Sequence, residues 1–122
     1  MDYNPYIYIM EYKIKVKSSE YNRMFLSILN FKLGLTNTEL DIVSVLLDYS
    51  ITVVDTKARE IIRIKLNKDK YTVANYISHL IDKQIFYRSE SKVCINPSLL
   101  GAIKDGNMLV ELTKEDDNSL QN

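Results

Sequence analysis

The first patterned stretch of the chain, Tyr6 to Val16, alternates between two kinds of position. Aromatic and apolar residues fill every second place, and the places between them become charged after Ile9. An alternation of period two, rich in tyrosine and β-branched residues, is typical of a β-strand. We therefore expect a strand here, with one face of its second half exposed to solvent.

In residues 18–34 the apolar positions are spaced three and four residues apart, as in an amphipathic helix. Either Ser18 or Ser19 is expected to cap the start of this helix, and Gly34 is expected to end it. The residues that repeat at helical spacing, and that we expect on one face, are Tyr21, Met24, Phe25, Ile28, Leu29 and Lys32.

A second helix is predicted to begin after Thr36. Thr36 and Glu39 have the spacing of a capping box, in which the threonine hydroxyl accepts from the third helical N–H and the glutamate reaches back. The positions expected to be buried in this helix are Leu40, Val43, Leu46 and Leu47. A linker, ITVV, separates it from the next helix.

A third helix is predicted to start at Asp55 or Thr56, either of which can cap it, and to run through Leu66. Asn67 can close this helix because asparagine tolerates a left-handed backbone. Its expected inward residues are Ala58, Ile61 and Ile62, with Leu66 as a further candidate at the end of the helix.

A fourth helix is predicted from Lys70 to Lys83, with Asp69 as its cap. Its expected inward residues are Val73, Tyr76, Ile77, Leu80 and Ile81. If these side chains face the core, the opposite side of the helix carries Thr72, Asn75, Ser78, His79 and Asp82.

The segment IFYRSESKVCINP predicts a short β-hairpin, in which apolar-rich arms flank the polar turn RSESK. Pro97 is expected to halt the second arm, and Ser98 can start a brief helix that Gly106 ends. Residues 107–113 predict a last short strand. The acidic and polar residues after it predict a disordered tail.

Composition limits the class of protein. A chain of 122 residues with 46% hydrophobic and 26% charged residues favours one globular domain. It has no apolar run of the roughly 20 residues that span a bilayer, and its N-terminus has an acid where a signal peptide carries bases. We expect a cytoplasmic protein that does not enter a membrane. The abundance of isoleucine, lysine, asparagine and tyrosine is associated with AT-rich genomes, such as those of some bacteria and phages.

The charge is zero overall but unevenly distributed. Residues 35–56 carry four acids and no base, residues 57–92 carry nine bases and four acids, and residues 105–122 carry five acids and one base. A protein that holds an anionic polymer needs a basic face rather than a basic total. The block at 57–92 is the place for such a face.

Catalytic chemistry is disfavoured. With one cysteine, Cys94, and one histidine, His79, the chain has neither a disulfide framework nor a cysteine-rich zinc site. Its glycines, Gly34, Gly101 and Gly106, have the positions of helix ends or breaks rather than those of a phosphate loop. We expect no catalytic residue, no metal and no cofactor, and no enzymatic activity.

The order of helix, helix, short polar connection, helix and hairpin resembles the winged helix-turn-helix family of DNA-binding domains. The local pattern is most similar to MarR-like regulators and to phage or plasmid replication proteins. LTNTELDIVSVLL resembles the opening helix of the family, and REIIRIKLNKDKYTVANYISHLIDKQIFYR its second helix, turn, recognition helix and wing entry. CINPSLL after the wing is similar to an ending found in replication-associated members. The resemblance covers about half of the chain, Leu35 to Pro97.

Two features depart from the family pattern. Gln84 stands where the family usually has glycine after the recognition helix, and KDKYT replaces a first turn that is usually rich in serine, arginine or glutamine. With these departures, the resemblance implies an α+β, mostly helical protein with a winged helix-turn-helix core. We expect residues 1–34 to form an N-terminal strand and helix extension that can mediate dimerisation, residues 35–112 to form the winged helix-turn-helix domain, and residues 113–122 to be an acidic disordered tail.

The function implied by the resemblance is binding of double-stranded DNA in transcription regulation or replication initiation, for example in a phage or mobile element. A helix in the major groove presents its N-terminal half to base edges, where Lys meets guanine and Asn meets adenine. The backbone N–H groups at the helix start add a phosphate site. The candidate DNA-binding residues are Lys68, Lys70, Tyr71, Thr72, Asn75 and His79 on or before the recognition helix, Arg88 and Lys92 on the wing, and Lys57 and Arg59 on the flanking helix.

Each of these side chains, taken alone, is also explained as an ordinary surface or packing residue. Glu60, Asp69 and Asp82 lie within the basic block and favour a different class, a protein–protein interaction module or a phage virion component that keeps the fold without binding DNA. An inhibitor that mimics DNA is disfavoured because the acids form no single stripe. The sequence leaves the first two alternatives open.

Overall fold

The computed structural model describes residues 15–104, a mostly helical α+β fold with one small sheet. Its elements are α1 (Ser18–Leu33), α2 (Asn37–Asp48), α3 (Thr56–Leu66), α4 (Lys70–Asp82), β1 (Phe86–Ser89), β2 (Lys92–Ile95) and α5 (Pro97–Lys104). The strand expected over 6–16 lies outside the described residues except for residues 15 and 16, which are not in a strand. The predicted strand at 107–113 and the predicted tail lie outside them as well.

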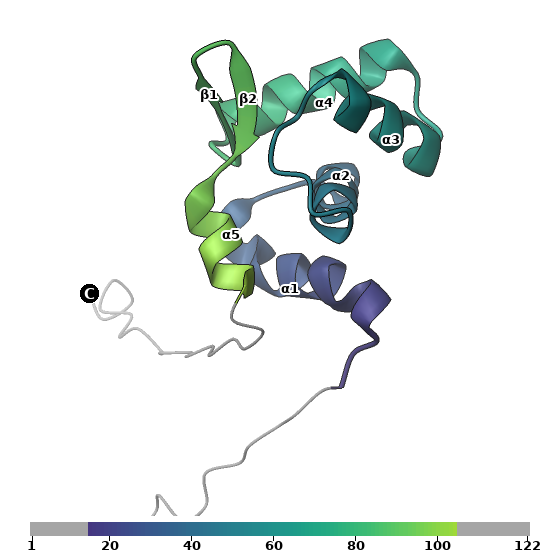
Figure 1. Cartoon of the computed structure of the whole chain (residues 1–122). Coiled ribbons are helices and arrows are strands. Elements are labelled where there is room, and N and C mark those ends of the chain that lie inside the picture. Colours follow the sequence, from purple (N-terminus) through teal and green to yellow (C-terminus); the bar gives the residue numbers. More distant parts are fainter. Residues whose placement is uncertain (1–14, 105–122) are drawn as a thin grey trace, which may run out of the picture.

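The helices are arranged around α2, which occupies the middle of the view in Figure 1, with α1 below it and α3 and α4 above. The β1–β2 hairpin lies at one end of α4, and α5 follows the hairpin in the chain. One core joins all these parts, because Leu26 of α1, Ile42 of α2, Ile62 of α3 and Leu80 of α4 are fully buried in the same cluster. The helix before residue 34 is therefore built into the fold that follows it.

Helix starts follow the predicted caps at three places. Thr36 and Glu39 form the complete capping box, the Asp55 carboxylate accepts from the Ala58 N–H at 2.8 Å, and Asp69 caps α4. The predicted serine cap of α1 is wrong, since its N-cap is Lys17 and no side chain caps it.

Helix ends depend on left-handed residues. Gly34 ends α1 with φ 66°, and Asn67 ends α3 with φ 52°, both as predicted. After α4 the left-handed residue is Gln84, with φ 64°. The Gln84 N–H donates to Ile81 O and the Ile85 N–H to Leu80 O, at 2.9 and 3.0 Å. This is a Schellman motif, which requires a left-handed backbone at this position. Glycine adopts that backbone most readily, but the residue here is glutamine.

The buried faces of α2, α3 and α4 largely match the predicted stripes, but that of α1 does not. Phe25 and Leu26 are buried in α1, whereas Met24 and Ile28 are 42% and 40% exposed and Phe31 is 80% exposed. Apolar residues surround most of this helix, so its periodicity alone did not identify the face that packs on α2.

The predicted hairpin is present, but its turn is tighter than expected. Phe86 pairs with Ile95 and Ser89 with Lys92, so the connection is only Glu90 and Ser91, and Glu90 takes φ 58°. Arg88 and Lys92, expected at the edges of a five-residue polar turn, therefore lie within the paired strands.

The linker after α2 adds a third strand-like segment to this sheet. Val53 forms an antiparallel bridge with Cys94, and two backbone bonds flank it. The Val54 N–H donates to Val93 O at 2.7 Å, and the Ile95 N–H donates to Thr52 O at 2.9 Å. The residues just before α3 are thus fixed to the base of the hairpin.

The helix expected from Ser98 begins one residue earlier, at Pro97. The Asn96 side chain accepts from the Ser98 N–H at 3.0 Å and donates to Gln84 O at 3.0 Å. Gly101, expected to mark a helix stop or break, lies inside α5. Gly106 lies outside the described residues. Within residues 15–104, no helix has the length and apolarity needed to cross a bilayer.

Candidate nucleic-acid interface

An open groove of about 810 Å³ lies between the start of α3, the first half of α4 and the hairpin. Its basic side chains are Arg59 from α3, Lys70 from α4, Arg88 from β1 and Lys92 from β2. Five of the ten predicted DNA-binding residues thus line one concave surface. Four of them are these basic residues, which come from four different elements, and the fifth is Tyr71. In the following, "the groove" means this surface.

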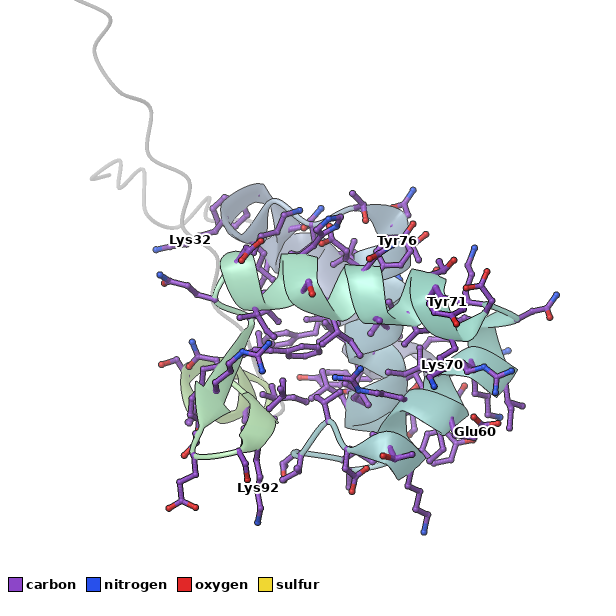
Figure 2. All side chains as sticks on the ribbon, turned by 90° about the horizontal axis from the view of Figure 1, so that it is seen from above. Lys32, Glu60, Lys70, Tyr71, Tyr76 and Lys92 are labelled. Carbon is purple, nitrogen blue, oxygen red and sulfur yellow. The ribbon has the colours of Figure 1, made fainter. Side chains whose placement is uncertain are left out.

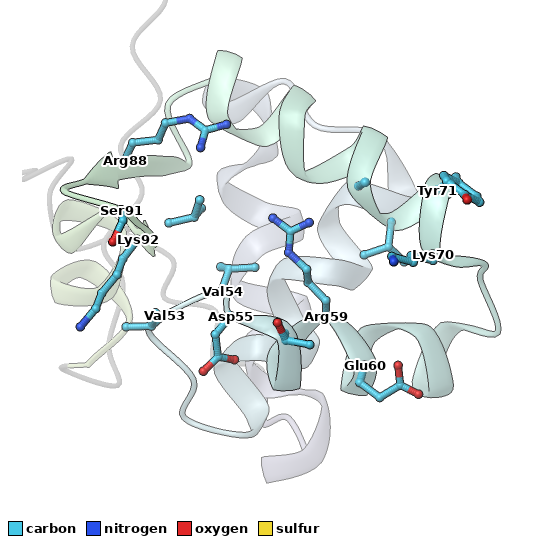
Figure 3. Close-up of a pocket in the computed structure, with 14 residues that line it drawn as sticks. Val53, Val54, Asp55, Arg59, Glu60, Lys70, Tyr71, Arg88, Ser91 and Lys92 are labelled. Carbon is cyan, nitrogen blue, oxygen red and sulfur yellow. The ribbon is translucent and has the colours of Figure 1, made fainter.

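Arg59 and Arg88 point into the groove from opposite walls (Figure 3). The position of Arg59 follows from the Asp55 cap, which starts α3 four residues earlier, and from the Arg59 N–H bond to Asp55 O at 3.0 Å. The position of Arg88 follows from its pairing with Val93 in the hairpin. None of the three ion pairs among residues 15–104 includes either arginine.

Lys70, Tyr71 and Lys92 lie at the rims. Lys70 and Tyr71 form the first turn of α4, and Tyr71 is 79% exposed. Figures 2 and 3 place Lys92 and Tyr71 at opposite ends of the groove. A tyrosine ring that is mostly exposed beside a lysine can stack on a base or pack along a sugar.

The other candidates lie outside the groove. Asn75 and His79 are exposed on the outer face of α4, and the His79 ring meets the Tyr76 ring edge-on, with centroids 6.3 Å apart. Lys57 and Lys68 are exposed near the two ends of α3. The outer face of α4 and the groove are therefore two adjacent surfaces rather than one.

Thr72 acts within the α4 cap. Its N–H donates to Asp69 Oδ1 at 2.8 Å, and its hydroxyl donates to Asp69 Oδ2 at 3.1 Å. The backbone and side-chain bonds from Thr72 are the main reason that the pKa of Asp69 is lowered from its ordinary value. The start of α4 already holds a carboxylate, so the expected phosphate site on these N–H groups is disfavoured.

Several bases of the 57–92 block are engaged elsewhere. Arg63 Nη1 contacts both carboxylate oxygens of Glu60, at 2.9 and 2.7 Å. Lys65 Nζ lies 5.4 Å from the centroid of the Tyr49 ring, and Lys83 Nζ pairs with Glu39 at 2.8 Å. The basic surface is thus narrower than the sequence count suggests, and it is centred on the groove.

The groove also contains features that sequence reasoning missed. The half-buried Val53 and Ala74 give it a small apolar wall, and behind this wall lie the core residues Val54, Val73 and Val93, which are at most 7% exposed. The β-branched run ITVV was the available signal for Val53 and Val54, because such residues are typical of strands. Two acids also line it: Asp55, which caps α3, and Glu60, which pairs with Arg63.

The basic side chains of this surface suit the binding of an anionic ligand. Among the described residues, no three of the metal-ligating types His, Cys, Asp and Glu gather in one place. The arrangement offers guanidinium and ammonium donors beside an apolar wall. Comparisons with protein-family models, with curated proteins and with solved structures found no match to this chain.

Proposed function

We propose that this protein binds double-stranded DNA through a winged helix-turn-helix arrangement, with α3 and α4 as the helix pair and the β1–β2 hairpin as the wing. The observation that carries the proposal is the convergence of Arg59, Lys70, Arg88 and Lys92 from four elements on one groove. The process served is transcription control or replication initiation, and catalysis is no part of the proposal.

The topology supports this assignment. The order is helix, bridging segment, two helices and hairpin, and the bridging segment, Thr52–Val54, pairs with the second hairpin strand. Fixing the hairpin to the linker before α3 sets the distance between the hairpin and α4. A rigid spacing of this kind is what a protein needs to contact a groove and the neighbouring backbone of one duplex together.

The proposed contacts divide into reading and positioning. Asn75, exposed one turn into α4, is the candidate for base-edge contact, because a side-chain amide bonds the donor and acceptor of adenine together. Lys70, Arg88 and Lys92 are candidates for phosphate contact. These contacts add affinity without sequence preference.

The salt dependence of binding tests the proposal. If phosphates supply most of the free energy, the logarithm of the association constant falls with the logarithm of salt concentration by about 0.9 per phosphate neutralised. Fluorescence anisotropy with a labelled random duplex measures this slope. Binding that does not depend on salt, or no binding at micromolar protein in low salt, rejects the DNA proposal.

Single variants separate the two kinds of contact. Asn75→Ala is expected to cost roughly 1–3 kcal/mol on a selected site and little on a scrambled one. Lys70→Ala and Arg88→Ala weaken both duplexes alike, and Arg88→Ala reduces the salt slope by about one. Lys32→Ala, which removes the same charge from the exposed end of α1, is the matched control and leaves binding unchanged.

A second candidate function, a protein–protein interaction module or virion component, is favoured by another observation. Met24, Ile28 and Phe31 follow helical steps along α1 and are 42%, 40% and 80% exposed. An apolar stripe of this kind is typical of a surface that meets a protein, either a second copy or a phage assembly partner. If the variants above bind both duplexes as the parent does while remaining folded, this candidate replaces DNA binding.

A further inference from the structure

The groove combines two chemistries, and the proposed DNA contact uses only one of them. Phosphates satisfy the four basic side chains but leave the half-buried Val53 and Ala74, and the 79% exposed ring of Tyr71, without a matching surface. A ligand that uses the whole groove carries apolar groups and carboxylates close together, as an acidic, apolar peptide does.

One segment of this chain has that composition. Residues 108–117 read MLVELTKEDD. Four of the first five residues are aliphatic or methionine, and the ten contain four acids and one base. The groove contributes four bases and two acids, and one of those acids, Glu60, is paired with Arg63. The segment and the groove are therefore complementary in both charge and apolarity.

We propose that residues 108–117 dock in the groove of their own molecule. Their apolar residues pack on Val53, Ala74 and the ring of Tyr71, and their carboxylates pair with the basic rim. The segment then occupies the surface offered to DNA and competes with it. The competition rests on the proposed function, whereas the docking does not.

The chain length allows this contact. Lys92, at one rim of the groove, is joined to Lys104 by β2 and the eight residues of α5, and a helix of that length is about 12 Å long. A fully extended chain spans up to about 14 Å from Lys104 to Met108, about 27 Å to Leu112 and about 44 Å to Asp117. A tether this short holds the segment at an effective concentration on the order of a millimolar, so weak individual contacts suffice for substantial occupancy.

Docking is measured without DNA, on the full chain. A nitroxide label is attached at Leu120→Cys in a Cys94→Ser background, and the amide signals of the ¹⁵N-labelled protein are recorded. Amides of Ala74, Arg88 and Ser91 in the groove are expected to broaden, and those of Met24 and Ile28 on α1 are not. Raising the salt to 1 M, where the screening length is about 3 Å, relieves the broadening. Equal broadening of both surfaces, or none, overturns the docking.

Two further samples identify the occupant. Full chain with Glu115→Gln, Asp116→Asn and Asp117→Asn is expected to lose the groove broadening, and retention of the effect overturns the role of the carboxylates. Mixing labelled, unenriched protein with unlabelled, ¹⁵N-enriched protein detects transfer between molecules. Broadening as strong in the mixture as in the single sample overturns docking within one molecule, because it assigns the occupant to a second copy.

DNA titration then tests the competition separately. The triply neutralised full chain is expected to bind a random duplex about three- to tenfold more tightly than the parent, which corresponds to a groove that is free for one tenth to one third of the time. Groove broadening without any change in DNA affinity retains the docking and overturns the competition. If no duplex is bound by either protein, the proposed function fails, and the nitroxide result still decides the docking.

Discussion

Replacing Lys83 by methionine leaves a buried carboxylate without its cation. Glu39 is 1% exposed, and its Oε1 accepts from the Thr36 N–H and from Lys83 Nζ, both at 2.8 Å. Its Oε2 has no hydrogen-bond partner among the described residues. Lys83 Nζ also donates to Gly34 O at 3.1 Å, so one ammonium connects the end of α4 to the α1–α2 junction. Methionine keeps much of the apolar stem and removes both contacts.

The expected loss follows from the burial of the two partners. Removing one member of a fully buried ion pair costs about 3–5 kcal/mol. The Lys83 side chain is 36% exposed, and water therefore screens part of its interaction with Glu39. We expect Lys83→Met to lower the free energy of unfolding by about 2–3 kcal/mol at pH 7.

The dependence of this loss on pH identifies its cause. Burial by itself raises the pKa of Glu39, but hydrogen bonds from Lys83 and Thr36 more than offset it and hold the pKa below its ordinary value. A carboxyl with a lowered folded-state pKa contributes stability above its unfolded pKa, and this contribution is lost as the pH falls through the folded value. In the variant, burial dominates and the folded pKa rises. The stability deficit of the variant therefore shrinks as the pH is lowered from 7 towards 5.

Urea unfolding followed by circular dichroism at pH 7 and pH 5 measures both effects. Lys32→Met, an exposed lysine on α1, is the matched control and is expected to change stability by less than about 0.5 kcal/mol. Adding Glu39→Gln to Lys83→Met is expected to recover part of the loss, because the remaining buried group is neutral. A deficit below about 0.5 kcal/mol, or one that is equal at both pH values, refutes the reasoning.

Three other outcomes are expected. Gln84→Gly removes the strain of a side chain on a left-handed backbone at φ 64°, and it is expected to stabilise the fold by about 1 kcal/mol. An unchanged thermal midpoint contradicts this. Gly34→Ala, at φ 66° with nothing within 4 Å of the added methyl group, is expected to destabilise by about 1 kcal/mol from backbone strain alone, and a neutral result in the same melting experiment counts against it. Phe31→Ser on the exposed α1 stripe is expected to leave stability unchanged and to abolish any self-association seen by sedimentation at high concentration. Equal sedimentation of a self-associating parent and the variant excludes this stripe as the dimer surface.

Local signals were the part of the fold that the sequence predicted well. The Thr36 capping box, the Asp55 and Asp69 caps and the closing residue Asn67 all depend on side chains within three residues of a helix end. Such contacts are formed by neighbours in the chain, so their residue types and spacing suffice to identify them.

Features that depend on tertiary packing were harder to predict from the sequence. In α1, apolar residues occur around most of the helix, and only the position of α2 decides that Leu26 is buried while Met24 is exposed. The groove joins Val53, Arg59 and Arg88, which are distant in sequence, and its basic residues were predicted from charge and resemblance rather than from proximity. Its apolar wall could be found only once the bridge to Cys94 placed the linker beside β2.

The same bridge fixes the base of the hairpin at the end away from its turn. At the base, the Val54 and Ile95 amides donate across the sheet, so their hydrogen exchange requires the linker to separate from β2. At the tip, the unpaired turn is only Glu90 and Ser91. Ordering a residue costs about 1–2 kcal/mol of conformational entropy, and a connection this short leaves at most two residues for a ligand at Arg88 to order. The linker before α3 makes the hairpin a pre-ordered contact.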